Sequence, residues 1–114
     1  MRWLFLLLLL FSLLNCGPFE SYYRGVYIYS VTATPTSQEQ VTLMNDSKTD
    51  ADISNWKLGD LNDPWAYNIP AGTIIAAGET CKFPGSTLGF QINDEDEKIY
   101  LRDDNDKIID TWTN

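Results

Sequence analysis

Short stretches of alternating apolar and polar residues, each closed by turn-forming residues, constrain the fold of this chain more than any other feature. From residue 26 onward, segments rich in β-branched and aromatic residues recur at spacings of roughly 8 to 12 residues. Alternate side chains of a strand face the same side, so this pattern is typical of strands with one buried face. No window of this region has a sustained helical period, and the pattern predicts an all-β sandwich. The predicted strands span residues 26–31, 41–44, 53–58, 73–75, 80–83, 98–102 and 107–112.

The first 16 residues follow a different pattern: a short basic start, an apolar run and a cysteine. The apolar run at residues 3–14 would form a helix of about 18 Å at roughly 1.5 Å per residue. The hydrocarbon core of a membrane is roughly 30 Å thick, so the run is too short to span it. It therefore predicts a signal peptide.

The segment Leu13-Leu14-Asn15-Cys16 resembles the lipobox of bacterial lipoproteins. The resemblance implies a signal peptide cleaved after residue 15, a diacylglycerol on the Cys16 thiol, and a lipid-anchored protein of the bacterial cell envelope, with the outer membrane as the expected site. Asn15 departs from the pattern, because a lipobox usually has Gly, Ala or Ser there. The alternative is an ordinary secretory signal, which would leave Cys16 free to form a disulfide with Cys81. Such a signal should show an A-x-A-like cleavage site, and the sequence has none.

The predicted organisation is therefore a lipoprotein signal peptide (1–15), a lipidated N-terminus and tether (16–25), and one domain (26–114). The tether carries Gly and Pro and has no period, as expected of a linker. Removing residues 1–15 from the 114 leaves 99, enough for one compact domain with one core.

Charge and composition exclude several classes of function. Sixteen acidic residues against eight basic ones give a formal net charge of −8, which repels phosphate backbones, so no nucleic acid partner is expected. The chain has no histidine, the commonest general base and metal ligand, so neither a Ser-His nor a Cys-His pair can be built. A glycosidase with two carboxylates is the enzyme class left, and a small plain sandwich has little room for its cleft. We expect no catalytic residue and no cofactor.

The acidic clusters at residues 94–97 and 103–106 suggest a calcium site at first sight. The strand between them would hold them about 17 Å apart at roughly 3.3 Å per residue, too far for shared ligands. Neither cluster has the spacing of an EF-hand loop, so we predict no metal site.

Four segments in order carry a family resemblance. They read EQVTLMN at 39–45, DISNWKLGD at 52–60, IPAGTIIAAG at 69–78, and a pair of strands between 89 and 110. Together they are similar to the lamin tail domain family over residues 26–113. The resemblance implies an immunoglobulin-like β-sandwich that takes part in protein contacts; the acidity of this chain argues against the chromatin contacts of nuclear lamins. Thr42 departs from the family, which usually has Glu there.

Four aromatic residues are candidates for binding. If the aliphatic residues of the first strand point inward, Tyr27 and Tyr29 share its outward face, as in recognition surfaces, although they could instead cover an edge strand. Trp65 and Tyr67 lie in a predicted loop, where they could stack on a sugar or plug the core. Trp56, on an alternating segment, is expected in the core.

The sequence thus predicts a non-enzymatic, lipid-anchored interaction or scaffold module. The alternative is a module that binds glycan or cell wall through these aromatics. The expected partners are the membrane, through the lipid on Cys16, and an envelope protein or glycan.

Overall fold

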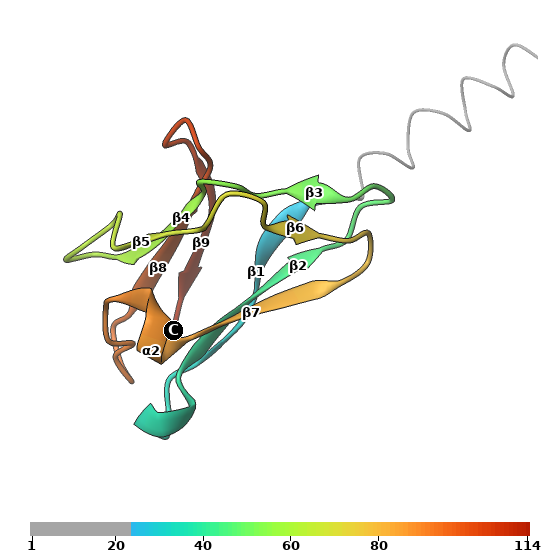
Figure 1. Ribbon diagram of the computed structural model, residues 1–114. Coiled ribbons are helices and arrows are strands. Elements are labelled where there is room, and N and C mark those ends of the chain that lie inside the picture. Colours follow the sequence, from blue (N-terminus) through green and yellow to red (C-terminus); the bar gives the residue numbers. More distant parts are fainter. Residues whose placement is uncertain (1–23) are drawn as a thin grey trace, which may run out of the picture.

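A computed structural model of the chain describes residues 24–114 (Figure 1). The predicted signal peptide (1–15) and all but the last two residues of the predicted tether (16–25), Cys16 included, lie outside the described residues. Within residues 24–114, no helix has the length and apolar character needed to cross a membrane.

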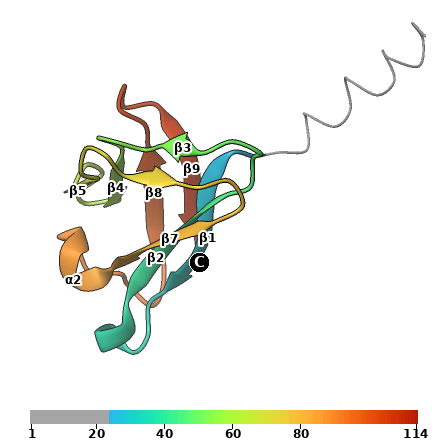
Figure 2. The same cartoon turned by 45° about the vertical axis from the view of Figure 1, so that its right-hand side comes forward.

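The described residues form nine strands and two single helical turns, which confirms the predicted all-β class. The strands pair antiparallel in sheets of order β1-β2-β7, β3-β6 and β5-β4-β8-β9. The three-stranded and four-stranded sheets face each other, and the short β3-β6 pair lies across one end (Figures 1 and 2). The elements are β1 (Val26–Thr32), η1 (Thr36–Gln38), β2 (Gln40–Asn45), β3 (Ala51–Asp52), β4 (Lys57–Asp60), β5 (Tyr67–Asn68), β6 (Ile74–Ile75), β7 (Thr80–Pro84), α2 (Gly85–Leu88), β8 (Lys98–Arg102) and β9 (Ile108–Thr113).

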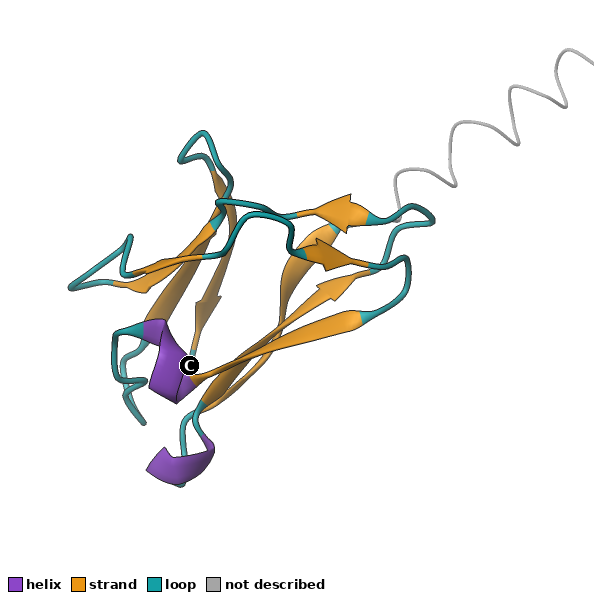
Figure 3. Ribbon diagram, in the orientation of Figure 1, coloured by secondary structure: helices purple, strands orange, loops and turns teal. Residues whose placement is uncertain are grey.

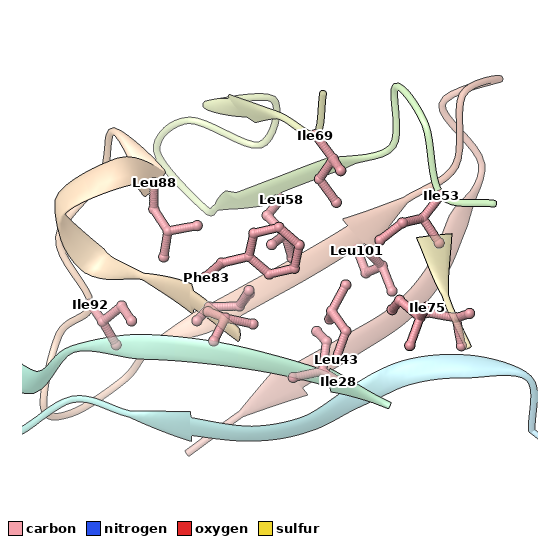
Figure 4. Packing of buried hydrophobic residues seen from close by; sticks show 13 residues of the cluster. Ile28, Leu43, Ile53, Leu58, Ile69, Ile75, Phe83, Leu88, Ile92 and Leu101 are labelled. Carbon is pink, nitrogen blue, oxygen red and sulfur yellow. The ribbon is translucent and has the colours of Figure 1, made fainter. Parts of the chain in front are cut away.

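The hydrophobic core fills the space between the two larger sheets (Figure 4). Leu43 of β2 faces Leu58 of β4 and Leu101 of β8, and all three are fully buried. The burial of β8 alternates strictly along the strand, as its sequence predicts. The two ends of the core are closed by loop and short-element residues, with Leu88 and Ile92 at one end and Ile53 and Ile75 at the other (Figure 4). One continuous core confirms a β-sandwich.

A β-bulge interrupts the first strand. Ile28 pairs with Leu43 and Ser30 with Thr42, so Tyr29 is the extra residue of β1. A bulge shifts the alternation of side chains beyond it. Val31, rather than Ser30, therefore packs against the core.

The predicted strand at 53–58 is wrong in its first part, which is a turn between β3 and β4; residues 57 and 58 begin β4. The Asp52 carboxylate accepts hydrogen bonds from both the N–H and the hydroxyl of Ser54, and Asn55 has a φ of 63°. Such local side-chain bonds compete with strand pairing. Trp56 still packs against the core as predicted, although it does so from the turn.

Asn45, the last residue of β2, is fully buried and joins three segments. Its Nδ2 donates to the carbonyl oxygens of Thr49 at 2.8 Å and Ile75 at 2.9 Å. Its Oδ1 accepts from the N–H of Ser47 at 3.1 Å and from the Ser47 hydroxyl at 2.7 Å. The side chain thus ties the turn after β2 to β6.

Asp110 joins the first strand to the last. Its Oδ2 accepts a hydrogen bond from the Ile28 N–H at 2.8 Å and lies 3.5 Å from Nη2 of Arg24. This carboxylate therefore bridges β1 and β9, which belong to different sheets. The contact closes one side of the sandwich.

Candidate interaction surface

The two tyrosines of β1 differ in how available they are. Tyr29, the bulged residue, has 60% of its surface exposed. Tyr27 is half-buried, and the guanidinium of Arg24 lies 3.9 Å from the centroid of its ring. Tyr29 is thus an open aromatic, whereas Tyr27 is covered on one face by the residue that leads into the domain.

The prediction that Trp65 and Tyr67 share one loop is wrong for Tyr67, which is the first residue of β5 and pairs with Leu58 of β4. Trp65, in the loop between β4 and β5, is 54% exposed. Tyr67 is half-buried, and its ring packs edge-on against Phe83, with the centroids 5.8 Å apart. Tyr67 therefore packs against the core, whereas Trp65 is open to solvent.

Trp65 instead contacts Arg102 of β8, which also contacts Tyr100; sequence reasoning missed both of these β8 residues. The Arg102 guanidinium lies 4.8 Å from the Trp65 ring centroid and 4.9 Å from that of Tyr100. Arg102 Nη1 also donates to the Pro64 carbonyl oxygen at 3.2 Å. Ile108, the cross-strand partner of Arg102, is 47% exposed. We call Trp65, Tyr100, Arg102 and Ile108 the Trp65 patch.

Gly59 allows the loop that carries Trp65 to fold back onto the sheet. Gly59 pairs with Tyr100 across β4 and β8. A Cβ at this position would lie 2.2 Å from the carbonyl carbon of Pro64, so only glycine admits the loop. A glycine inside a strand pattern marks such a close approach of backbone, and it was the sequence signal that could have located the patch.

The carboxylate of Asp60 fixes the same loop. Asp60 is buried, and its Oδ1 accepts from the N–H of Asn62 at 3.0 Å and from that of Asp63 at 2.8 Å. The Asp60 N–H donates in turn to the Asp63 carbonyl oxygen at 3.1 Å. The loop before Trp65 is therefore held by its own backbone and by one buried side chain.

The Trp65 patch carries positive charge in an acidic protein. Lys57 pairs with Arg102 across the sheet, and its Nζ lies 2.8 Å from Oδ1 of Asp106. Arg102, in contrast, is held by two aromatic rings and a carbonyl. Because the formal net charge is −8, a guanidinium fixed among apolar side chains is a distinctive local feature.

Two titratable groups among the described residues, Asp52 and Cys81, have a clearly shifted pKa. Hydrogen bonds from the Ser54 hydroxyl and then from its N–H hold the pKa of Asp52 below the usual range. Burial raises the pKa of the Cys81 thiol, which is free and half-buried on β7. Among residues 24–114, no group of three or more His, Cys, Asp or Glu side chains is arranged to hold a metal ion.

Comparison with known families agrees with this architecture. The sequence model of the Lamin Tail Domain matches residues 20–114, whereas a search of curated proteins found no match. The match covers all four segments that suggested this family from the sequence. Such domains are immunoglobulin-like and generally non-catalytic, which suggests an interaction module. The chain belongs to the lamin tail domain family.

Proposed function

We propose that this protein is a non-enzymatic interaction module, anchored by lipid in the bacterial cell envelope, and that the Trp65 patch is its protein-binding surface. The observation that carries the proposal is an exposed tryptophan held against an arginine. Trp65 is 54% exposed while the guanidinium of Arg102 lies against its ring.

The composition of the Trp65 patch supports protein binding. Trp, Tyr and Arg are the residues most enriched at the energetic centres of protein interfaces. Here one of each stands on a single face, with the exposed apolar Ile108 beside them. Since Trp65 and Arg102 already stack in the free protein, a partner would lose little side-chain freedom in ordering them.

The lipid anchor is supported by the sequence of the N-terminus. A basic start, an apolar run too short to span a membrane and Cys16 directly behind it match the order of a lipoprotein signal. The tether would then reach the domain at Arg24, beside the turn after β2, where the Arg24 and Gly25 N–H groups donate to the Asp46 carboxylate at 3.2 and 2.8 Å.

Site-directed photo-crosslinking tests the binding surface. A photoreactive amino acid at position 108, in the cells that make the protein, should give a discrete adduct with a partner. The same amino acid at position 74 is the matched control, because Ile74 is 58% exposed and lies on β6, outside the patch. Trp65→Ala should remove the adduct and leave the melting temperature nearly unchanged, since Trp65 is exposed. Equal adducts at both positions, or an adduct that survives Trp65→Ala, would contradict the proposal.

Intact mass analysis of protein extracted from membranes tests the anchor separately. We expect a mature chain that begins at Cys16 and carries diacylglycerol, and a Cys16→Ser variant that remains unprocessed. An unmodified Cys16 joined to Cys81 by a disulfide would contradict the anchor and leave the surface proposal untouched.

Glycan binding through the exposed aromatics remains the alternative. It is favoured by the exposure of Trp65 and Tyr29, and it predicts a glycan-array signal that Trp65→Ala abolishes. Because Tyr67 packs inward against Phe83, it is not available to stack on a sugar beside Trp65, in contrast to what the sequence suggests.

A further inference from the structure

A hollow of about 510 Å³ lies between η1 and α2. The two helical turns stand at the same end of the sandwich, where they are the purple elements of Figure 3. Sites for small molecules usually have volumes of about 300 to 1,000 Å³. We propose that this hollow binds one neutral sugar unit of a glycan, a function separate from that of the Trp65 patch.

Glu39 builds the hollow by holding two of its walls. The residue is 8% exposed, and its Oε1 accepts a hydrogen bond of 2.6 Å from the Ile92 N–H. Its backbone oxygen accepts another of 2.7 Å from the N–H of Gly85, the first residue of α2. Because one residue fixes both segments, the walls stand in place before any ligand arrives, which lowers the entropic cost of binding.

The close approach of these walls depends on a glycine. A Cβ at position 85 would lie 2.7 Å from the Cβ of Glu39, closer than two such atoms can stand. Gly85 therefore lets α2 begin directly against Glu39. The two residues are 46 positions apart in the chain, so the hollow is a product of the sheet pairing between β2 and β7.

The chemistry of the lining favours a neutral polyhydroxyl ligand. Hydroxyl and amide groups both donate and accept hydrogen bonds, and a carboxylate accepts up to about four, so Glu39 keeps capacity beyond its bond to Ile92. Phe90 is the one aromatic residue of the lining, half-buried where it packs against the core, and an apolar surface of this kind suits the C–H face of a pyranose. The groups that carry this argument are Thr36, Ser37, Glu39, Ser86, Phe90 and Gln91.

An anionic ligand does not suit the hollow. Its lining contains no Lys or Arg, and phosphates and carboxylates are held in proteins mainly by such charged donors. The net charge of −8 would also repel an anion. A neutral sugar needs no cationic donor and is not repelled by the negative net charge.

The position of the hollow leaves it open to a large glycan. Arg24 precedes β1 and η1 follows it, so the seven residues of β1 separate them by about 23 Å at roughly 3.3 Å per residue. Figure 1 shows η1 at the end of β1 opposite to the one that follows Arg24. Binding of the sugar does not depend on the anchor proposed for Cys16.

Protein-observed NMR tests the proposal on the full chain in detergent. Methyl glycosides of neutral hexoses and of N-acetylhexosamines are titrated, and at least one should shift the amide signals of Ser37, Ser86 and Gln91 with a saturable, millimolar Kd. The double variant Ser86→Ala with Gln91→Ala should raise that Kd about tenfold, the factor that corresponds to 1.4 kcal/mol. Thr111→Ala, which removes an exposed hydroxyl from β9, is the matched control and should leave Kd unchanged.

Three results would overturn the inference. They are no shift at the hollow with any neutral sugar, an unchanged Kd in the double variant, or tighter binding there of a sugar acid or a peptide. Trp65→Ala separates this proposal from the previous one, because it should abolish the crosslink at position 108 and leave sugar binding intact. Loss of sugar binding in Trp65→Ala would place the sugar on the Trp65 patch and refute the site proposed here.

Discussion

Asn45→Asp should be one of the most damaging single-atom changes in this domain. The substitution replaces the Nδ2 donor by an oxygen. That oxygen would face the carbonyl oxygens of Thr49 and Ile75, which now accept hydrogen bonds of 2.8 and 2.9 Å from Asn45. Because Asn45 and its hydrogen bond to Ile75 are buried, water cannot supply the donor that is lost there.

The expected cost follows from these contacts. Each of the two hydrogen bonds contributes about 1 kcal/mol. The Ile75 carbonyl, left buried without this donor, costs about 1–3 kcal/mol more, whereas the Thr49 carbonyl can still accept from the Ser47 hydroxyl. Burying an uncompensated charge costs about 3–5 kcal/mol. These terms overlap, so we expect the free energy of unfolding to fall by about 4 kcal/mol at pH 7, a large share of the 5–15 kcal/mol of a typical domain.

The pH dependence identifies the cause. Burial beside two carbonyl oxygens should raise the pKa of the new carboxyl at position 45 above its unfolded value, since both disfavour the charged form. A raised pKa in the folded state means that stability is lost as pH rises through it and regained as pH falls. The recovery should be partial, because a protonated carboxyl offers one donor for two carbonyls.

Urea unfolding followed by tryptophan fluorescence, at pH 7 and at pH 4, measures both effects. Asn45→Ala removes the same donors without adding charge, so its deficit relative to the native protein should be smaller than that of Asn45→Asp and should not follow the titration of position 45. Asn68→Asp, the same chemical change on the exposed side of β5, should stay within about 0.5 kcal/mol of the native protein. A deficit of Asn45→Asp below 1 kcal/mol at pH 7, or one equal to that of Asn45→Ala at both pH values, would refute the reasoning.

Three further predictions concern backbone contact and titration. Gly59→Ala should lower the free energy of unfolding by about 3 kcal/mol or more, because the new Cβ would lie 2.2 Å from the loop backbone. Gly72→Ala is the control: Gly72 has a φ of +85° but open space around it, so this change should cost only about 1–2 kcal/mol. Equal losses of stability in thermal melts of the two variants would contradict this. NMR titration should give the Asp52 carboxyl a pKa below 3.8, and Ser54→Ala should raise that pKa. The stability that the Asp52 carboxylate contributes should be lost only as pH falls through the lowered pKa. Alkylation of Cys81 by iodoacetamide should reach its half-maximal rate at a higher pH in the folded protein than in urea, because burial raises the pKa of the thiol; the reverse order would show that the thiol is not desolvated.

Much of the fold is readable from local patterns. The segments that became β1, β2, β8 and β9 are visible as alternating residues bounded by turn formers. The segment at 53–58 shows where this reasoning fails, because the hydrogen bonds that Asp52 accepts from Ser54 turn the chain although the alternation continues. A period-2 pattern records which residues prefer burial, and it carries no information on a local polar contact that bends the backbone.

The Trp65 patch could be predicted from the sequence only in part. Trp65 is visible in the sequence as an aromatic in a loop, but its stacking on Arg102 joins residues 37 positions apart. The pairing of β4 with β8, together with the space left by Gly59, brings them together. Tyr67, two residues further on, has the same sequence context and packs instead against Phe83.

By itself, the sequence determined the all-β class, the absence of histidine and the acidic charge balance, because composition and alternation are properties of the chain alone. Its resemblance to the lamin tail domain family also lies in the sequence, and the family model confirms it. Tertiary structure decided which of its polar and aromatic side chains meet: Asn45 with the turn and β6, Trp65 with Arg102, and Glu39 with the two walls of the hollow. The physical reason is that the preference of a residue for burial depends on its own side chain, so it can be recognised from the local sequence. Contacts between distant residues, in contrast, are set by strand register, by a bulge in β1 and by the close approach of backbone at two glycines.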